Sequence, residues 1–184
     1  MRSISQACID SSVCNLRGNE AVKSRVSFHF IYSFFHMEAK ATQALLNELV
    51  ETLKDGQKGY ADAMTDVEDA SLKDTFKKYA AQRAEYLTEI EDQMFKLNLT
   101  PDESGSATAT VHRAWIDLKA ALTNKDNKAV LNECERGEDY AVKTYQTALK
   151  VQDLPAPVKS VIEKQYQGVQ AAHNAIKSLR DSAK

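Results

Sequence analysis

The fold class can be inferred from residues 72–97, LKDTFKKYAAQRAEYLTEIEDQMFKL. Apolar side chains recur there at steps of three and four residues, the pattern of a helix with one buried face. The apolar residues of this face are Leu72, Phe76, Tyr79, Leu87, Ile90, Met94 and Leu97. Ser71, with Asp74 three residues later, is a variant of the capping box that starts many helices. The pattern therefore predicts a helix over 71–97 that packs into an all-α bundle.

One charged residue, Arg83, lies at the centre of the same face. A buried guanidinium without a partner is very costly, so a carboxylate should lie beside it. The best candidate is Glu138, which falls on the apolar face of another expected helix. We expect a buried ion pair within a polar network, and such networks define register more than they add stability. The expected members are Gln57, Tyr60, Arg83, Tyr86, Glu138, Tyr145 and His173.

Similar periodicity predicts helices at about 40–67 and 127–150, and one that opens at Leu154-Pro155-Ala156-Pro157 and runs to about 180. A short helix is expected at about 108–122. The first two long helices are joined by a short connection, as are the last two, so each pair should form an antiparallel hairpin. The expected fold is a ferritin-like four-helix bundle with the short extra helix in a lengthwise crossover. A simple up-down bundle with a capping helix is the alternative.

The whole chain has the composition of one all-helical domain. Of its 184 residues, 43% are hydrophobic and 27% are charged, and only six are Gly and three are Pro. The net charge of −2 provides no field that would attract nucleic acid, so no nucleic-acid partner is expected. No apolar run reaches the roughly 18–20 residues of a membrane span, and a cytoplasmic location is expected. Cys8, Cys14 and Cys134 have neither metal-ligand nor disulfide spacing.

Residues 1–36 differ from the rest of the chain. They hold four of the six Phe and two of the three Cys, and they lack helical periodicity. A signal peptide, a membrane-surface or partner-binding tail, and a translated leader before a true start at Met37 are the three interpretations. We favour the leader, because Met37-Glu38-Ala39-Lys40 leads directly into a helix. The expected organisation is an N-terminal extension over 1–36 and a bundle over 37–184.

A di-iron bundle needs a Glu from each of two helices and Glu-x-x-His from each of the other two. At the corresponding inward positions this chain has Gln57 on one helix, and Arg83 and Tyr86 on the next. Arginine cannot bind a cation because it stays protonated. We therefore predict no cofactor, with a residual iron or manganese site at Glu138 and His173 as the alternative.

Other candidate residues are weaker. His112 is a lone histidine on the short helix and is expected to be exposed. Glu133, Glu135 and Asp139 flank Glu138 and could attract cations loosely. The sequence contains no evident nucleophile–base pair, phosphate-binding loop or basic stripe. It therefore identifies no catalytic residue and no small-molecule substrate.

Several motifs occur together along the bundle segment. They are LNELVETLKDGQKGY at 46–60, Gln82-Arg83, His112-Arg-Ala-Trp115, Arg136-Gly-Glu138, Tyr145 and His173. On these motifs, residues from about 43 to 180 resemble an uncharacterised bacterial family of ferritin-like four-helix bundles, a domain of unknown function. Some relatives are linked to bacterial stress responses, so the resemblance implies a stress role without a defined activity.

The expected function is accordingly non-catalytic and stress-associated, through binding or assembly. A homodimer is an open expectation, because ferritin-like bundles often pair. The alternative is a degenerate metal-binding oxidase or peroxidase that uses iron or manganese at Glu138 and His173.

Overall fold

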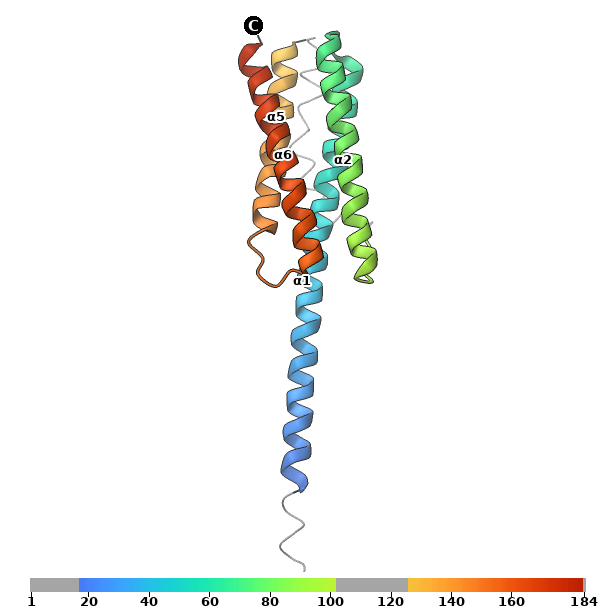
Figure 1. Cartoon of the computed structure of the whole chain (residues 1–184), viewed down its shortest axis with the longest axis vertical. Helices are drawn as coiled ribbons and strands as arrows, with labels where there is room; N and C mark the ends of the chain where they lie inside the picture. The colour runs from blue at the N-terminus through green and yellow to red at the C-terminus, as the bar shows by residue number, and fades with distance from the viewer. Residues whose placement is uncertain (1–16, 102–125, 184) are drawn as a thin grey trace, which may run out of the picture. The chain divides into compact units, whose positions relative to one another are not determined.

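The computed structural model describes the backbone of residues 17–101 and 126–183, and the side chains within these ranges from residue 40 onward, except residue 66. The described residues form four helices and no strand (Figure 1). The helices are α1 (Arg17–Asp66), α2 (Ala70–Lys96), α5 (Asn127–Ala148) and α6 (Ala156–Ser182). The chain divides into two units, Met1–Ala41 and Thr42–Lys184, and the second is an all-α four-helix bundle, as predicted.

The directions of α2 and α5 show how the two helical hairpins are connected. The first turns of α2, with Leu72 and Phe76, pack in one apolar cluster with Val130 and Leu131 from the start of α5. The last turns of both helices share a second cluster, described below. α2 and α5 therefore run parallel, so the end of α2 and the start of α5 lie at opposite ends of the bundle (Figure 1), as a lengthwise connection requires. The short helix expected at 108–122 lies outside the described residues.

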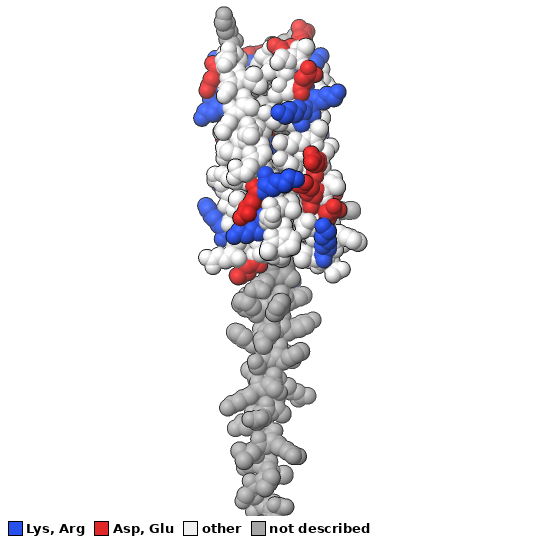
Figure 2. All heavy atoms as spheres, viewed as in Figure 1, with Lys and Arg blue, Asp and Glu red and all other residues white. Residues whose placement is uncertain are grey.

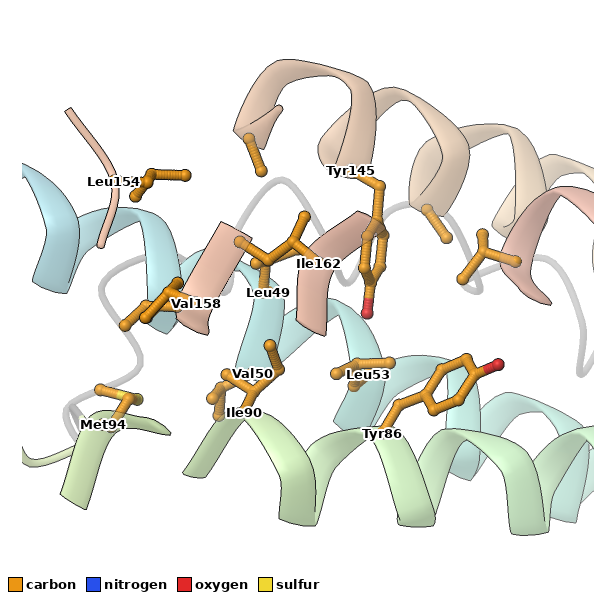
Figure 3. Close-up of a cluster of buried hydrophobic side chains, with 14 residues drawn as sticks. Leu49, Val50, Leu53, Tyr86, Ile90, Met94, Tyr145, Leu154, Val158 and Ile162 are labelled. Carbon is orange, nitrogen blue, oxygen red and sulfur yellow. The ribbon is translucent and has the colours of Figure 1, made fainter. Parts of the chain in front are cut away.

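The bundle core consists of two apolar clusters. The cluster in Figure 3 combines Leu49, Val50 and Leu53 of α1, Tyr86, Ile90 and Met94 of α2, Tyr145 of α5, Leu154 of the connection before α6, and Val158 and Ile162 of α6. The other cluster includes Tyr60, Phe76, Tyr79, Cys134 and Ile176. Along α2 and α5, Arg83 and Glu138 fall between the members of the two clusters. A polar layer therefore separates the two parts of the core.

The ends of α2, α5 and α6 agree with the sequence-based expectation to within about two residues, but one cap differs. Asp69, not Ser71, caps α2, and its side chain accepts hydrogen bonds from the backbone N–H groups of Ser71 and Leu72. A carboxylate in the capping position satisfies N–H groups that have no partner within the helix. Asp126 caps α5 in the same way, and Pro157 lies in the first turn of α6.

The first helix begins at Arg17 rather than near residue 40. Residues 17–36 lack an apolar period, so the sequence pattern did not predict this part of the helix. Once a helix has formed, each added residue contributes one backbone hydrogen bond, so a helix can extend without a buried face. No Pro interrupts 17–66, and Gly18 is the only Gly before Gly56.

The surface of the bundle mixes charges of both signs. On the face shown in Figure 2, acidic and basic side chains alternate, without a continuous patch of one sign. This agrees with the formal net charge of −2. Within the described ranges, no helix combines the length and the apolar character needed to cross a membrane.

Candidate functional site

A buried ion pair lies in the polar layer between the two apolar clusters. Arg83 Nη2 donates to Glu138 Oε1 at 2.5 Å, and each side chain is only 1% exposed. Tyr60 donates its hydroxyl to the same carboxylate oxygen at 2.7 Å. Arg83 Nη1 donates to Gln82 Oε1 at 2.7 Å. Hydrogen bonds to charged groups are stronger than those between neutral groups, so these contacts offset part of the cost of burying both charges.

The local sequence makes room for this arrangement. A Cβ atom at Gly56 would lie 3.5 Å from the stem of Arg83, so the α1 backbone lies against the arginine side chain. Tyr60, one turn further along α1, has its ring centroid 5.9 Å from that of Phe76 and 5.5 Å from that of Tyr79. These aromatic contacts hold the hydroxyl of Tyr60 toward Glu138.

Burial and charge shift the pKa values of the groups around the pair in consistent directions. Burial raises the pKa of Tyr60 well above its usual value, and the negative charge of Glu138 adds to the effect. The pKa of the Cys134 thiol is raised by the same two causes. Burial acts to lower the pKa of Arg83, but the charge of Glu138, together with Tyr60 and the hydrogen bond to Glu138, outweighs burial and raises this pKa. Tyr60 and Cys134 are therefore neutral at physiological pH, and Arg83 is charged.

The second oxygen of Glu138 has no hydrogen-bond partner among the described residues, although it is buried. A buried carboxylate oxygen without a donor is costly, so the carboxylate depends on the two donors at Oε1. Losing either donor would leave Glu138 poorly compensated.

A second row of hydrogen-bonded polar side chains runs from the core to the surface between α2 and α6. Tyr145 donates to Gln165 Oε1 at 2.7 Å. Gln165 Nε2 donates to Glu89 Oε2 at 2.8 Å and to the backbone carbonyl of Tyr86 at 3.0 Å. Lys164 ends this row with an ion pair to Glu89 at 2.6 Å. The hydrogen bond from Gln165, followed by that from Lys164, lowers the pKa of Glu89.

Tyr86 joins the Arg83 layer indirectly. Its hydroxyl accepts a hydrogen bond from Gln82 Nε2 at 3.3 Å, and Gln82 also contacts Arg83. A Cβ atom at Gly168 of α6 would lie only 1.9 Å from the oxygen of this hydroxyl. Gly168 is therefore required for the position of Tyr86.

Two residues expected in the buried network lie at its edge. Gln57 is only partly buried, because Gly56, the preceding residue, is the one that faces Arg83. His173 is also only partly buried, and its ring nitrogens contact Asp139 and Asn174 instead of Glu138. The two residual metal candidates, Glu138 and His173, are thus not brought together by a hydrogen bond. His112 lies outside the described residues.

Around His173 the structure forms a different group of polar side chains. His173 Nε2 lies 2.8 Å from Asp139 Oδ1, and His173 Nδ1 lies 3.2 Å from Asn174 Oδ1. One ligand atom each from Glu135, Asp139 and His173 lie within 4.8 Å of one another. Arg180 forms an ion pair with Glu135. The group therefore combines two carboxylates of α5 and an imidazole of α6, with Glu135 buried and Asp139 exposed.

The sequence indicated the group of Glu135, Asp139 and His173 only in part. Glu135 and Asp139 were expected to attract cations loosely, but nothing linked them to His173. The available signal was their i, i+4 spacing, which places both on one face of α5. Their partner on α6 could not be inferred, because the register between two helices depends on packing along the whole hairpin.

The fold and the polar layer define a class of protein: an all-α bundle with an ion pair across its centre. The chain belongs to the family described as domain of unknown function DUF2383, which matches residues 41–151. The match covers α1 from residue 41, α2 and α5, and so includes both partners of the ion pair. No curated protein matches the sequence significantly.

Proposed function

We propose that this protein is a ferritin-like, non-catalytic bundle that acts by binding or assembly, in the cytoplasm and in a stress-associated role. The Arg83–Glu138 pair carries the proposal, because it occupies the centre of the bundle with two fully buried opposite charges. The lengthwise connection between the parallel helices α2 and α5 supports the ferritin-like class. The stress role rests on the family resemblance.

The charge at the centre argues against a resident cation there. Arginine stays protonated, and a second positive charge a few ångströms away is strongly repelled in a poorly polarisable interior. Glu138 Oε1 already accepts from Arg83 and Tyr60. These contacts favour the non-catalytic proposal over an iron- or manganese-dependent oxidase or peroxidase at Glu138 and His173.

Metal analysis and ferrous-iron oxidation test the non-catalytic part. The full chain, purified without chelators, is compared with Glu138→Gln and with the matched control Glu163→Gln, at an exposed position of α6. We expect Glu138→Gln to change neither metal content nor oxidation rate. Near-stoichiometric iron or manganese that is lost in Glu138→Gln and kept in Glu163→Gln would overturn the proposal. Tyr60→Phe serves as a second variant if Glu138→Gln does not fold, because it perturbs the same carboxylate without changing its charge.

Light scattering after size exclusion tests the assembly part. One chain has a mass of 20.5 kDa. We expect the full chain to elute as a homodimer whose dissociation depends on protein concentration. A mass of one chain at every concentration would overturn self-assembly as the mode of action.

A further inference from the structure

A group of three side chains from α5 and α6 has the geometry of a metal site. Glu135 and Asp139 lie one turn apart on α5, and His173 approaches them from α6. The ligand atoms of a bound zinc ion lie about 2.0–2.2 Å from the metal, so they lie roughly 3–4 Å from one another. The His173–Asp139 separation of 2.8 Å is already close to this range, and no separation in the group exceeds 4.8 Å.

The surroundings of His173 are compatible with a metal ion at Nε2. Both ring nitrogens face an oxygen, Asp139 Oδ1 at Nε2 and Asn174 Oδ1 at Nδ1. A neutral imidazole has only one N–H, so it cannot donate to both oxygens. With a metal ion at Nε2, the single N–H of a neutral imidazole lies on Nδ1 and can donate to Asn174 Oδ1. Metal-binding histidines almost always donate their second ring nitrogen to such an oxygen.

Arg180 supplies the positive charge beside Glu135. Its guanidinium forms ion pairs with Glu135 and with Asp181. The Glu135 side chain is only 9% exposed, so its negative charge needs a cation nearby. Arg180 is part-exposed and keeps Asp181 as a partner, so it can leave Glu135 when another cation arrives. Arg180 therefore competes with a metal ion for Glu135.

We propose that Glu135, Asp139 and His173 form a binding site for a divalent transition-metal ion, with Asn174 orienting the histidine and Arg180 as the competing cation. Two carboxylates and one imidazole suit Zn²⁺, whereas Ca²⁺ and Mg²⁺ prefer oxygen ligands alone. Three protein ligands leave a fourth position of a tetrahedral zinc ion for water. The site uses none of the groups of the buried ion pair.

Calorimetric titration of the full chain with Zn²⁺, after removal of bound metal, tests the site. We expect one binding event that is weakened by about tenfold or more in His173→Gln and in Asp139→Asn, because removing a ligand costs at least as much as removing a supporting group. The matched controls are Glu163→Gln and Asp153→Asn, both at exposed positions, which should bind like the wild type. Circular dichroism confirms that each variant is helical.

Two further variants separate a built site from loose attraction to acidic side chains. Asn174→Ala, which changes no charge, should weaken Zn²⁺ binding by about tenfold. Arg180→Gln should strengthen it, because the competing cation is removed. Absence of a binding event in the wild type would overturn the proposal, as would equal binding by wild type, His173→Gln and Asn174→Ala. Metal lost in His173→Gln but kept in Glu138→Gln would support this site and leave the proposed function intact.

Discussion

Among the described residues, Arg83 is the largest fully buried side chain, and it carries a charge. Its guanidinium has one carboxylate partner, Glu138, whose second oxygen has no donor among the described residues. A buried ion pair adds little stability compared with an apolar pair of the same size, but removing one partner leaves the other charge uncompensated. The pair should therefore matter most when it is broken on one side only.

Arg83→Met tests this directly. It leaves the buried Glu138 without its counter-charge, so the free energy of unfolding should fall by about 3–5 kcal/mol. Urea denaturation followed by circular dichroism measures the change. Arg136→Met, which removes an exposed arginine from its pair with Glu133, is the matched control and should cost roughly 0–1 kcal/mol.

The double variant Arg83→Met/Glu138→Leu distinguishes charge burial from packing. With both charges gone, stability should return to near that of the wild type or exceed it. If the double variant is as unstable as Arg83→Met, lost packing rather than the unpaired carboxylate explains the effect.

Two glycines that face polar side chains should respond in opposite ways to a methyl group. At Gly56 a Cβ atom makes ordinary contacts at 3.5 Å, so Gly56→Ala should stabilise by up to about 1 kcal/mol through helix propensity. At Gly168 a Cβ atom would lie 1.9 Å from the Tyr86 hydroxyl, so Gly168→Ala should destabilise by about 1–3 kcal/mol. Thermal unfolding compares the two variants.

Tyr86→Phe provides the control for the Gly168 prediction. Removing the hydroxyl relieves the closest contact, so Gly168→Ala should cost less in a Tyr86→Phe background than in the wild type. Equal costs in both backgrounds would show that the hydroxyl is not the source of the strain.

At the scale of the helix, the start of α2 is set by Asp69 and not by the capping box that the sequence suggested. Asp69→Ala removes the acceptor for two backbone N–H groups and should lower stability by roughly 0.5–2 kcal/mol. Ser71→Ala and Asp74→Ala should each have a smaller effect. Thermal melts of the three variants check this order. A larger loss of stability in Ser71→Ala than in Asp69→Ala would show that Ser71 is the more important cap.

At the scale of the whole molecule, stability should depend on pH through Glu89, which links α2 to α6. Its pKa is lowered in the folded state by the hydrogen bonds from Gln165 and Lys164. A lowered pKa gives stability that is present above the unfolded-state pKa and is lost as the pH falls through the folded-state pKa. Glu89→Gln should therefore reduce stability at neutral pH and flatten its decline in acid, with the variant and wild type converging below both pKa values.

Urea titrations at a series of pH values measure this dependence. Glu163→Gln, at an exposed position on α6, is the control and should keep the wild-type profile. A Glu89→Gln profile parallel to that of the wild type would contradict the role of Glu89.

Much of the fold could be predicted because apolar spacing reports directly on buried helix faces. The bounds of α2, α5 and α6 and the lengthwise connection followed from it. Arg83 was identifiable because a charge in an apolar stripe is rare, and Glu138 because it shares that property. The position of His173 was not predictable, since its partner Asp139 is exposed and looks like any solvated acid. The early start of α1 was missed because helix extension needs no buried face.

The polar layer between the two apolar clusters also affects how the chain folds. Arg83 and Glu138 are 55 residues apart and belong to different hairpins, whereas each hairpin can form from local contacts. Before the hairpins meet, both charges are hydrated, and docking must remove that water. A misaligned docking leaves a charge buried without its partner, which is very costly. Only the correct alignment of the two hairpins avoids this cost, so the pair favours that alignment during folding.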